Sequence, residues 1–187
     1  MSLSDLQVGW KKREDIMDQR FWIVRFTLVA ISFSVFLAAS VQFAEAQQAI
    51  FLVRHAEQSL EGEDPPLTEA GRRRATALAT LLKDAAITVI YESGIRRTME
   101  TAKPLADTLN VDIKTYPRAD IVGFVGKIRS QHAQDRVLIV SQSLRIPRWL
   151  KAMGHSADIT IAPTEYDNLF VIIPKGDGGP LVLRLRY

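Results

Sequence analysis

The sequence predicts an α/β fold, specifically a three-layer α/β/α sandwich around a mostly parallel central sheet with an antiparallel edge. Two observations lead to this prediction. Short, continuous apolar runs alternate with segments of helical periodicity along the 187 residues, which is the order that β-α-β connections produce. Two late β-rich runs flank the Gly/Pro-rich stretch "PKGDGGP", which indicates a hairpin at the edge of the sheet.

The first part of the domain reads as two strand–helix pairs. Strands are expected over 49–53 and 87–91, because each run is apolar and a strand buried on both faces has that pattern. Thr68 is the expected N-cap of the first helix, whose apolar residues recur at i, i+3, i+4 and i+7 up to about residue 82. The second helix is expected within 93–109.

The rest of the domain repeats this order and then departs from it. Pro104 should bend or restart the second helix, because proline removes a helical hydrogen bond. The remaining expected elements are a short edge strand over 111–116, a weaker helix over 121–128, a third buried strand over 137–140, a helix over 145–153, and hairpin strands over 168–173 and 181–187.

The first 46 residues are set apart from this domain. Residues 26–41 form an uncharged apolar run, preceded by Arg20 and Arg25 and followed by Ala44–Glu45–Ala46, which is the layout of a secretory signal peptide. We therefore divide the chain into a polar extension over 1–16 that reads as a mis-called start, a signal peptide or membrane anchor over 17–46, and a folded domain over 47–187.

This N-terminal segment predicts where the protein works. Cleavage would deliver the domain by export to the periplasm. The alternative is an uncleaved anchor in the inner membrane, with residues 21–43 as the tether, since residues 21–24 lengthen the apolar run if Arg25 reaches the membrane surface.

Composition excludes several functional classes. The net charge of +3 is mild, and no basic run exceeds Arg72–Arg74, so a nucleic-acid partner is not expected. The chain has no cysteine, which excludes a disulfide framework, a thiolate zinc site and a cysteine nucleophile. The three histidines are widely spaced, and the acids form no cluster, so neither a metal nor another cofactor is expected.

Polar turns follow the three most apolar strands. They carry Arg54–His55, the segment from Ser93 to Arg97, and the segment from Ser141 to Arg145. Ligands of open α/β sheets bind beyond the carboxyl ends of the strands, so these turns form one site if the three strands are neighbours. Guanidinium groups match phosphate oxygens and an imidazole can attack phosphorus, so the turns predict a phosphate site.

The same segments resemble the histidine phosphatase superfamily, which is phosphoglycerate mutase-like. "FLVRHAE" is similar to its Arg-His-Gly signature, with Ala56 in place of glycine, and "PLTEAGRRR" is similar to its Leu-Thr-x-x-Gly helix entry. "YESGIRRTMETA" resembles its Ser-x-x-x-Arg-Thr-x-x-Thr-Ala segment, and "VLIVSQSLRIP" resembles a turn that usually reads Val-Gly-His-Ser-Asn-x-x-Pro. The resemblance extends from about Ala49 to Tyr187, points to the small secreted bacterial branch, and implies metal-independent hydrolysis of a small phosphorylated substrate.

The resemblance also assigns roles to residues. His55 is the nucleophile that becomes a phosphohistidine, and Arg54 and Arg97 clamp the phosphate, with the spacing from Ser93 selecting Arg97 over Arg96. Gln142 replaces the second catalytic histidine, which implies reduced activity, because an amide carries no charge. The implied catalytic set is His55, Arg54, Arg97 and Gln142, and the substrate-binding set is Arg54, Arg97, Ser93, Gln142, Ser143 and Arg145.

Some assignments stay open at this stage. Arg145 either returns the missing positive charge to the site or faces solvent. Glu57 and Asp120 are candidates for the general acid, with Asp64 weaker, and the competing interpretation is an arginine partner for Glu57 and exposed loop residues for the other two. The alternative function is a pseudophosphatase that binds a phosphorylated ligand without turnover. A mutase is least favoured, because the chain lacks room for the long substrate-covering insertions of mutases.

Overall fold

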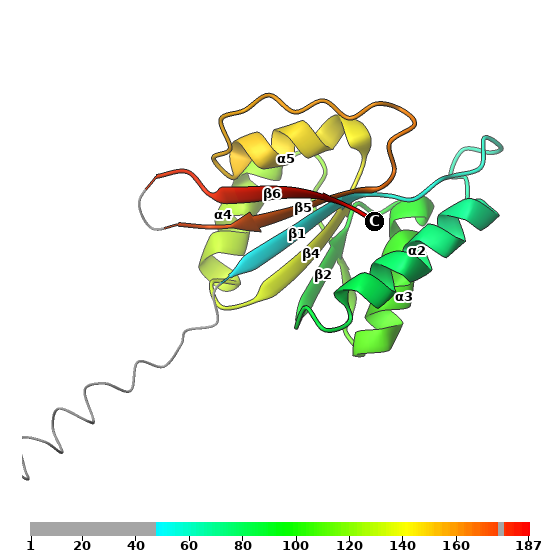
Figure 1. Ribbon diagram of the computed structural model, residues 1–187, viewed down its shortest axis with the longest axis horizontal. Coiled ribbons are helices and arrows are strands. Elements are labelled where there is room, and N and C mark those ends of the chain that lie inside the picture. The colour runs from blue at the N-terminus through cyan, green and yellow to red at the C-terminus, as the bar shows by residue number, and fades with distance from the viewer. Residues whose placement is uncertain (1–47, 176–177) are drawn as a thin grey trace, which may run out of the picture. The chain divides into compact units, whose positions relative to one another are not determined.

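The computed structural model describes residues 48–175 and 178–187, where the predicted alternation of elements is present (Figure 1). The strands are β1 (Ala49–Arg54), β2 (Val89–Glu92), β3 (Ile113–Thr115), β4 (Arg136–Ser141), β5 (Asn168–Ile173) and β6 (Leu181–Arg186). The helices are α2 (Glu69–Leu82), α3 (Arg96–Leu109), α4 (Ile121–Gln131) and α5 (Ile146–Ala152), with a 3₁₀ turn, η1 (Ser143–Arg145), before α5. The predicted signal peptide or anchor and the polar extension lie outside the described residues.

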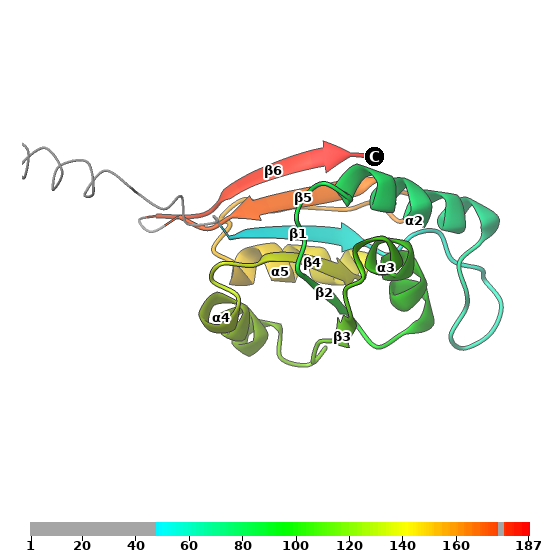
Figure 2. The same ribbon diagram turned by 90° about the horizontal axis from the view of Figure 1, so that it is seen from below.

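The six strands form one sheet in the order β3-β2-β4-β1-β5-β6. Strands β3, β2, β4 and β1 are parallel, whereas β5 is antiparallel to β1 and β6 is antiparallel to β5. The predicted mostly parallel sheet with an antiparallel edge is therefore confirmed, and Figure 2 shows β6 at its outer margin. Strand β4 lies between β2 and β1, so the three most apolar strands are neighbours.

Alternate side chains of the central strands enter two separate cores. Leu52 and Ile139 point to the face covered by α4 and α5, where Trp149 is fully buried. Val53 and Val140 point to the opposite face and pack against α2 and α3. This period-two alternation is what a sheet covered on both faces requires. Figure 1 shows the two helix pairs on opposite sides of the sheet.

Two boundary predictions were wrong. The second strand begins at Val89, two residues after its predicted start; Thr88, just before it, donates its N–H to the carbonyl of Arg136 and its hydroxyl to Asp135. Helix α3 continues through Pro104 without a restart, and buried Leu105 and neighbouring alanines offset the missing hydrogen bond. Among the helices of the described residues, none has the length and apolar character needed to cross a membrane.

Candidate functional site

The carboxyl ends of β1, β4 and β2 bring the three predicted turns into contact. The main-chain N–H of His55 donates to the carbonyl of Ser141 at 2.9 Å, which joins the β1 turn to the end of β4. The side-chain amide nitrogen of Gln142 donates to the hydroxyl of Ser93 at 2.7 Å, which joins the β4 turn to the β2 turn. The convergence expected from the sequence is therefore present.

His55 is held as a neutral imidazole with one nitrogen free. Its Nδ1 lies 2.8 Å from the carbonyl oxygen of Ala56, and since a carbonyl only accepts, Nδ1 carries the hydrogen. Burial, together with the positive charges of Arg97 and Arg54, lowers the pKa of His55 to about 4. The Nε2 atom therefore keeps its lone pair at neutral pH, which is the state a nucleophile needs.

The start of α2 fixes the chain that follows His55. The N–H of Thr68 donates to the carbonyl of Glu57 at 2.9 Å, and the Thr68 hydroxyl caps the helix at the N–H of Gly71. A Cβ atom at Gly71 would lie 2.1 Å from the same Glu57 carbonyl, so only glycine permits this approach. The "LTEAG" segment thus places the start of α2 directly against the turn that carries His55.

Arg54 is buried and fixed by a loop that comes much later in the chain. One terminal nitrogen donates to the carbonyls of Ala162, Pro163 and Glu165, and the guanidinium stacks 3.7 Å from the ring centre of Tyr166. Burial lowers the pKa of Arg54, although Tyr166 and nearby acids act in the opposite direction. Its Nε atom is buried and has no partner among the described residues.

Arg97 presents a similar unpaired donor. Its Nε is also buried without a partner among the described residues, while a terminal nitrogen lies 3.9 Å from the carboxylate of Asp64. Arg96 instead turns outward to pair with Glu100 at 2.7 Å. Asp64 accepts the main-chain N–H of Arg96 at 3.0 Å and so caps the start of α3. The geometry therefore favours Arg97 over Arg96 as the second arginine of the candidate site, beside Arg54.

A directed chain of hydrogen bonds sets the orientation of Gln142. The Thr98 hydroxyl donates to the buried carboxylate of Glu92 at 2.8 Å, so its oxygen is free to accept from Ser93 at 3.1 Å. Ser93 then accepts from the Gln142 amide, which leaves the Gln142 Oε1 atom buried without a partner among the described residues. One of the two amide hydrogens is thus already committed, and the other is available to a ligand.

The remaining residues of the β4 turn are less tightly involved. Arg145 donates to the carbonyl of Arg118 at 2.6 Å, so its guanidinium is tied to the segment before α4. Ser143 is half-buried, and Leu144 is 92% exposed. Charge compensation by Arg145 and ligand binding by Ser143 stay predictions.

Both candidate acids have structural partners. The carboxylate of Glu57 receives two hydrogen bonds from Arg74, at 2.9 and 3.0 Å. Burial raises the pKa of Glu57, but the hydrogen bonds and charge of Arg74 outweigh burial and hold it below its ordinary value. Asp120 caps α4 by accepting the N–H of Gly123 at 2.8 Å. These contacts favour structural roles, and proton transfer by either residue stays a prediction.

Sequence reasoning missed three supporting residues. Glu92 holds the β2 turn, Tyr166 stacks on Arg54, and the Thr101 hydroxyl accepts the main-chain N–H of Ala56 at 3.0 Å. Glu92 offered a signal, because a carboxylate ending an apolar strand must find buried donors. Nothing local in the sequence pairs Tyr166 with Arg54.

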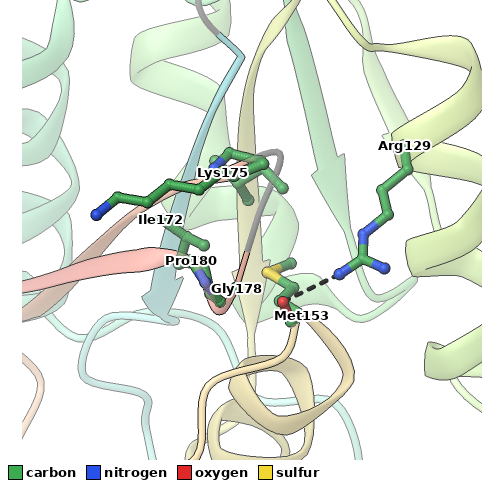
Figure 3. Close-up of a pocket in the computed structure, with 8 residues that line it drawn as sticks. Arg129, Met153, Ile172, Lys175, Gly178 and Pro180 are labelled. Carbon is green, nitrogen blue, oxygen red and sulfur yellow. Dashed lines mark hydrogen bonds between the residues drawn. The ribbon is translucent and has the colours of Figure 1, made fainter.

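Two cavities lie away from these turns. The first, of about 340 Å³, lies near the amino end of β1, where Arg129 donates to the carbonyl of Met153 at 3.0 Å (Figure 3). The second, of about 500 Å³, lies between β3 and α4 and contains Asp120. Apart from Asp120, neither cavity is lined by a predicted site residue.

Known proteins with related sequences cover part of the chain. Residues 50–120 match the family model of the histidine phosphatase superfamily (branch 1), a range that includes Arg54, His55 and Arg97 but not Gln142. A protein of Yersinia enterocolitica named "Probable phosphoglycerate mutase GpmB" is 38% identical over 76 residues, which cover 37% of this chain and 35% of that protein. The chain thus spans about a third of the length of this relative.

Solved structures share the fold over most of the domain. The protein histidine phosphatase SixA, complexed with tungstate, has a TM-score of 0.63 at 16% identity and covers 74% of this chain and 96% of its own. A phosphoserine phosphatase from Entamoeba histolytica, in complex with 3-phosphoglyceric acid, has a TM-score of 0.54 at 15% identity, with 75% and 97% covered. Residues 50–120 are therefore similar to the histidine phosphatase superfamily, and the domain shares its fold with these solved phosphatases.

Proposed function

We propose that this domain is a phosphomonoester hydrolase that works through a phosphohistidine at His55, with activity reduced because Gln142 stands where the superfamily has its second histidine. The observation that carries this proposal is the protonation state of His55. It is a neutral imidazole whose Nε2 lone pair is unprotonated, and two arginines lie beside it. Arg54 and Arg97 each contribute a buried Nε donor that has no partner within residues 48–175 and 178–187, which suits phosphoryl oxygens. The expected substrate is a small phosphorylated molecule.

The chemistry divides into two balanced steps. The Nε2 lone pair of His55 forms a bond to phosphorus while the bond to the ester oxygen breaks, and the leaving oxygen takes up a proton from solvent. Water then attacks phosphorus and releases a proton to solvent, the nitrogen–phosphorus bond breaks, its electron pair returns to Nε2, and inorganic phosphate leaves. The Nδ1 hydrogen remains on its bond to the Ala56 carbonyl in both steps, which keeps the ring oriented.

Gln142 makes both steps slower in this proposal. A protonated histidine would bring a charge-assisted donor to the moving phosphoryl group, whereas the amide brings one neutral hydrogen bond. Loss of a single transition-state donor costs on the order of 10² to 10³ in rate. The nucleophile and both arginines remain, so measurable turnover is expected.

The alternative function is a pseudophosphatase that binds a phosphorylated ligand without turnover. The observation that favours it is that the carboxylates nearest the site already have partners. Glu57 pairs with Arg74, Asp64 caps α3, and Asp120 caps α4, so no candidate acid is free to protonate a leaving group. The two functions share the arginine clamp and differ in whether His55 is used.

The deciding experiment follows the fate of phosphate on the purified domain. p-Nitrophenyl phosphate is offered to wild type, His55→Ala, Arg54→Ala, Arg97→Ala and Gln142→His, and phosphohistidine, bound phosphate and released phosphate are measured. The hydrolase predicts an acid-labile phosphoenzyme that is absent in His55→Ala. If phosphate binding survives His55→Ala and no variant, including Gln142→His, turns over substrate, the pseudophosphatase replaces it.

We also propose that the domain is exported to the periplasm, with an inner-membrane anchor as the alternative. The support is the sequence of residues 17–46 alone. Mass spectrometry of the protein from a periplasmic extract tests this, because cleavage after Ala46 predicts a chain that begins at Gln47. Full-length protein in the membrane fraction would instead favour the anchor.

A further inference from the structure

The cavity between β3 and α4 has the composition of a site for a small anionic molecule. Its volume of about 500 Å³ lies in the range of small-molecule sites. Lys114 and Lys127 supply two positive charges at its rim, while Tyr91 and Phe124, which pack edge to face at 4.9 Å and are nearly buried, contribute aromatic atoms to its floor. This combination suits a ligand that joins an acidic group to a flat apolar part.

The acidic groups around this cavity already have donors. Asp120 lines the cavity, but its carboxylate accepts the N–H of Gly123 at 2.8 Å. Asp135, behind the cavity, accepts from His132 Nδ1 at 2.7 Å and from the Thr88 hydroxyl at 2.7 Å. The charged side chains that line the cavity are thus two lysines and one carboxylate, a balance that favours an anionic ligand.

One segment, residues 115–118, is shared between the cavity and the candidate phosphate site. Thr115 and Pro117 line the cavity. Three residues of this segment, Thr115, Tyr116 and Arg118, each form one hydrogen bond to the end of β2 or to the β4 turn. These bonds run from the Thr115 hydroxyl to Glu92 (2.6 Å), between the Tyr116 and Ser141 hydroxyls (2.7 Å), and from Arg145 to the Arg118 carbonyl (2.6 Å).

We propose that this cavity is a second binding site, for a small molecule that combines an anionic group with a flat apolar part, and that its occupancy changes phosphate affinity at the His55 site. A ligand that presses on Thr115 and Pro117 displaces the segment that holds the β2 and β4 turns. By linkage, phosphate at the His55 site changes the affinity of the cavity by the same factor. The coupling rests on the proposed function, whereas binding in the cavity does not.

The first experiment tests the cavity alone. The probe is 8-anilinonaphthalene-1-sulfonate, followed by fluorescence, with the uncharged N-phenyl-1-naphthylamine as its matched control. We expect saturable binding of the sulfonate that weakens about tenfold in Lys114→Gln/Lys127→Gln, because two favourable charge contacts are lost. The control variant, Lys83→Gln/Lys103→Gln, loses the same charge elsewhere and should bind within about twofold of wild type.

Two results would overturn the cavity site. One is an equal loss of binding in both double variants, which would mean that only net charge matters. The other is equally tight binding of the uncharged probe, which would mean that Lys114 and Lys127 do not recognise the anionic group of the ligand.

The second experiment tests the coupling. Calorimetry measures the affinity of orthovanadate, a phosphate analogue, with and without saturating sulfonate probe. We expect at least a threefold change in wild type and a smaller change in Thr115→Val, which keeps the shape of the side chain but removes its hydrogen bond to Glu92. If the affinity for vanadate is the same with and without the sulfonate probe, the coupling is contradicted. If vanadate fails to bind even without probe, the proposed function and the coupling fall together, and the first experiment still decides the cavity.

Discussion

The turn after β1 and the turn after β4 lie side by side but are held in different ways. The β1 turn is fixed mainly by main-chain hydrogen bonds, because the His55 N–H donates to the Ser141 carbonyl and the Glu57 carbonyl accepts from the Thr68 N–H. The β4 turn places its functional group through one side-chain bond, from Gln142 to Ser93. The position of His55 is therefore built into the fold, whereas the group at position 142 can change without disturbing it.

The strongest test of the main-chain control is Gly71→Ala. Its new Cβ would lie 2.1 Å from the Glu57 carbonyl, so either α2 or the His55 turn must move. We expect a loss of about 3 kcal/mol in the free energy of unfolding, measured by urea denaturation, at the upper end of over-packing costs. Gly126→Ala in α4, where the new Cβ meets nothing within 4 Å, is the matched control and should stabilise by about 0.5 to 1 kcal/mol. Equal effects of both substitutions would refute close docking at Gly71.

Arg54→Lys tests whether the shape of the guanidinium matters as well as its charge. Lysine keeps the charge but cannot both reach the 162–165 carbonyls and offer a second fixed donor to phosphate. We expect kcat/KM for p-nitrophenyl phosphate to fall on the order of 10²-fold. Tyr166→Phe keeps the stacking ring and should stay within about twofold, while Tyr166→Leu should lose roughly tenfold. Wild-type activity in Arg54→Lys would show that charge alone suffices.

The burial of His55 should make stability depend on pH. Its pKa is about 4 in the folded protein, against an ordinary value of 6.5, so between these values the unfolded chain binds a proton that the folded protein does not. Stability is therefore complete above pH 6.5 and declines as pH falls, by about 2 kcal/mol between pH 7 and pH 5. The difference in unfolding free energy between wild type and His55→Gln, measured at several pH values, isolates this contribution. A difference that stays flat across this range would contradict the lowered pKa.

Glu57→Gln should have the smallest effect. If Glu57 serves only Arg74, loss of its charge weakens a half-buried ion pair and lowers stability by about 1 kcal/mol. Turnover should change by no more than about twofold, because the amide still accepts a hydrogen bond from Arg74. Glu69→Gln, which breaks a solvent-exposed pair with Arg72, is the control. A fall of 10²-fold in kcat for Glu57→Gln alone would instead identify Glu57 as the general acid.

Most of the fold could be predicted from the sequence, because its signals are local. Continuous apolar runs identified β1, β2 and β4, and helical spacing with Thr68 identified the start of α2. The predicted start of β2 and the predicted restart of α3 at Pro104 were wrong, whereas a bend of α3 at Pro104 stays a prediction; α3 stays continuous because its buried face packs into the core.

The candidate site also has a part that the sequence predicts and a part that only the tertiary structure shows. Its principal residues follow from motif and strand order, whereas their supports come from remote segments. The Glu57 partner Arg74 lies on α2, and the Arg54 acceptors lie more than 100 residues further along the chain. No local pattern encodes these pairings, so they require the tertiary structure.

Trp149 gives the domain an intrinsic optical reporter. It is the one tryptophan within residues 48–187, and its indole N–H donates to the hydroxyl of Ser141 at 3.1 Å. The Ser141 carbonyl also accepts the His55 N–H, and Ser141 precedes Gln142, so the indole contacts the residue that joins the β1 and β4 turns. Any event that shifts those turns should alter the emission of this residue, which makes unlabelled protein suitable for stopped-flow measurements.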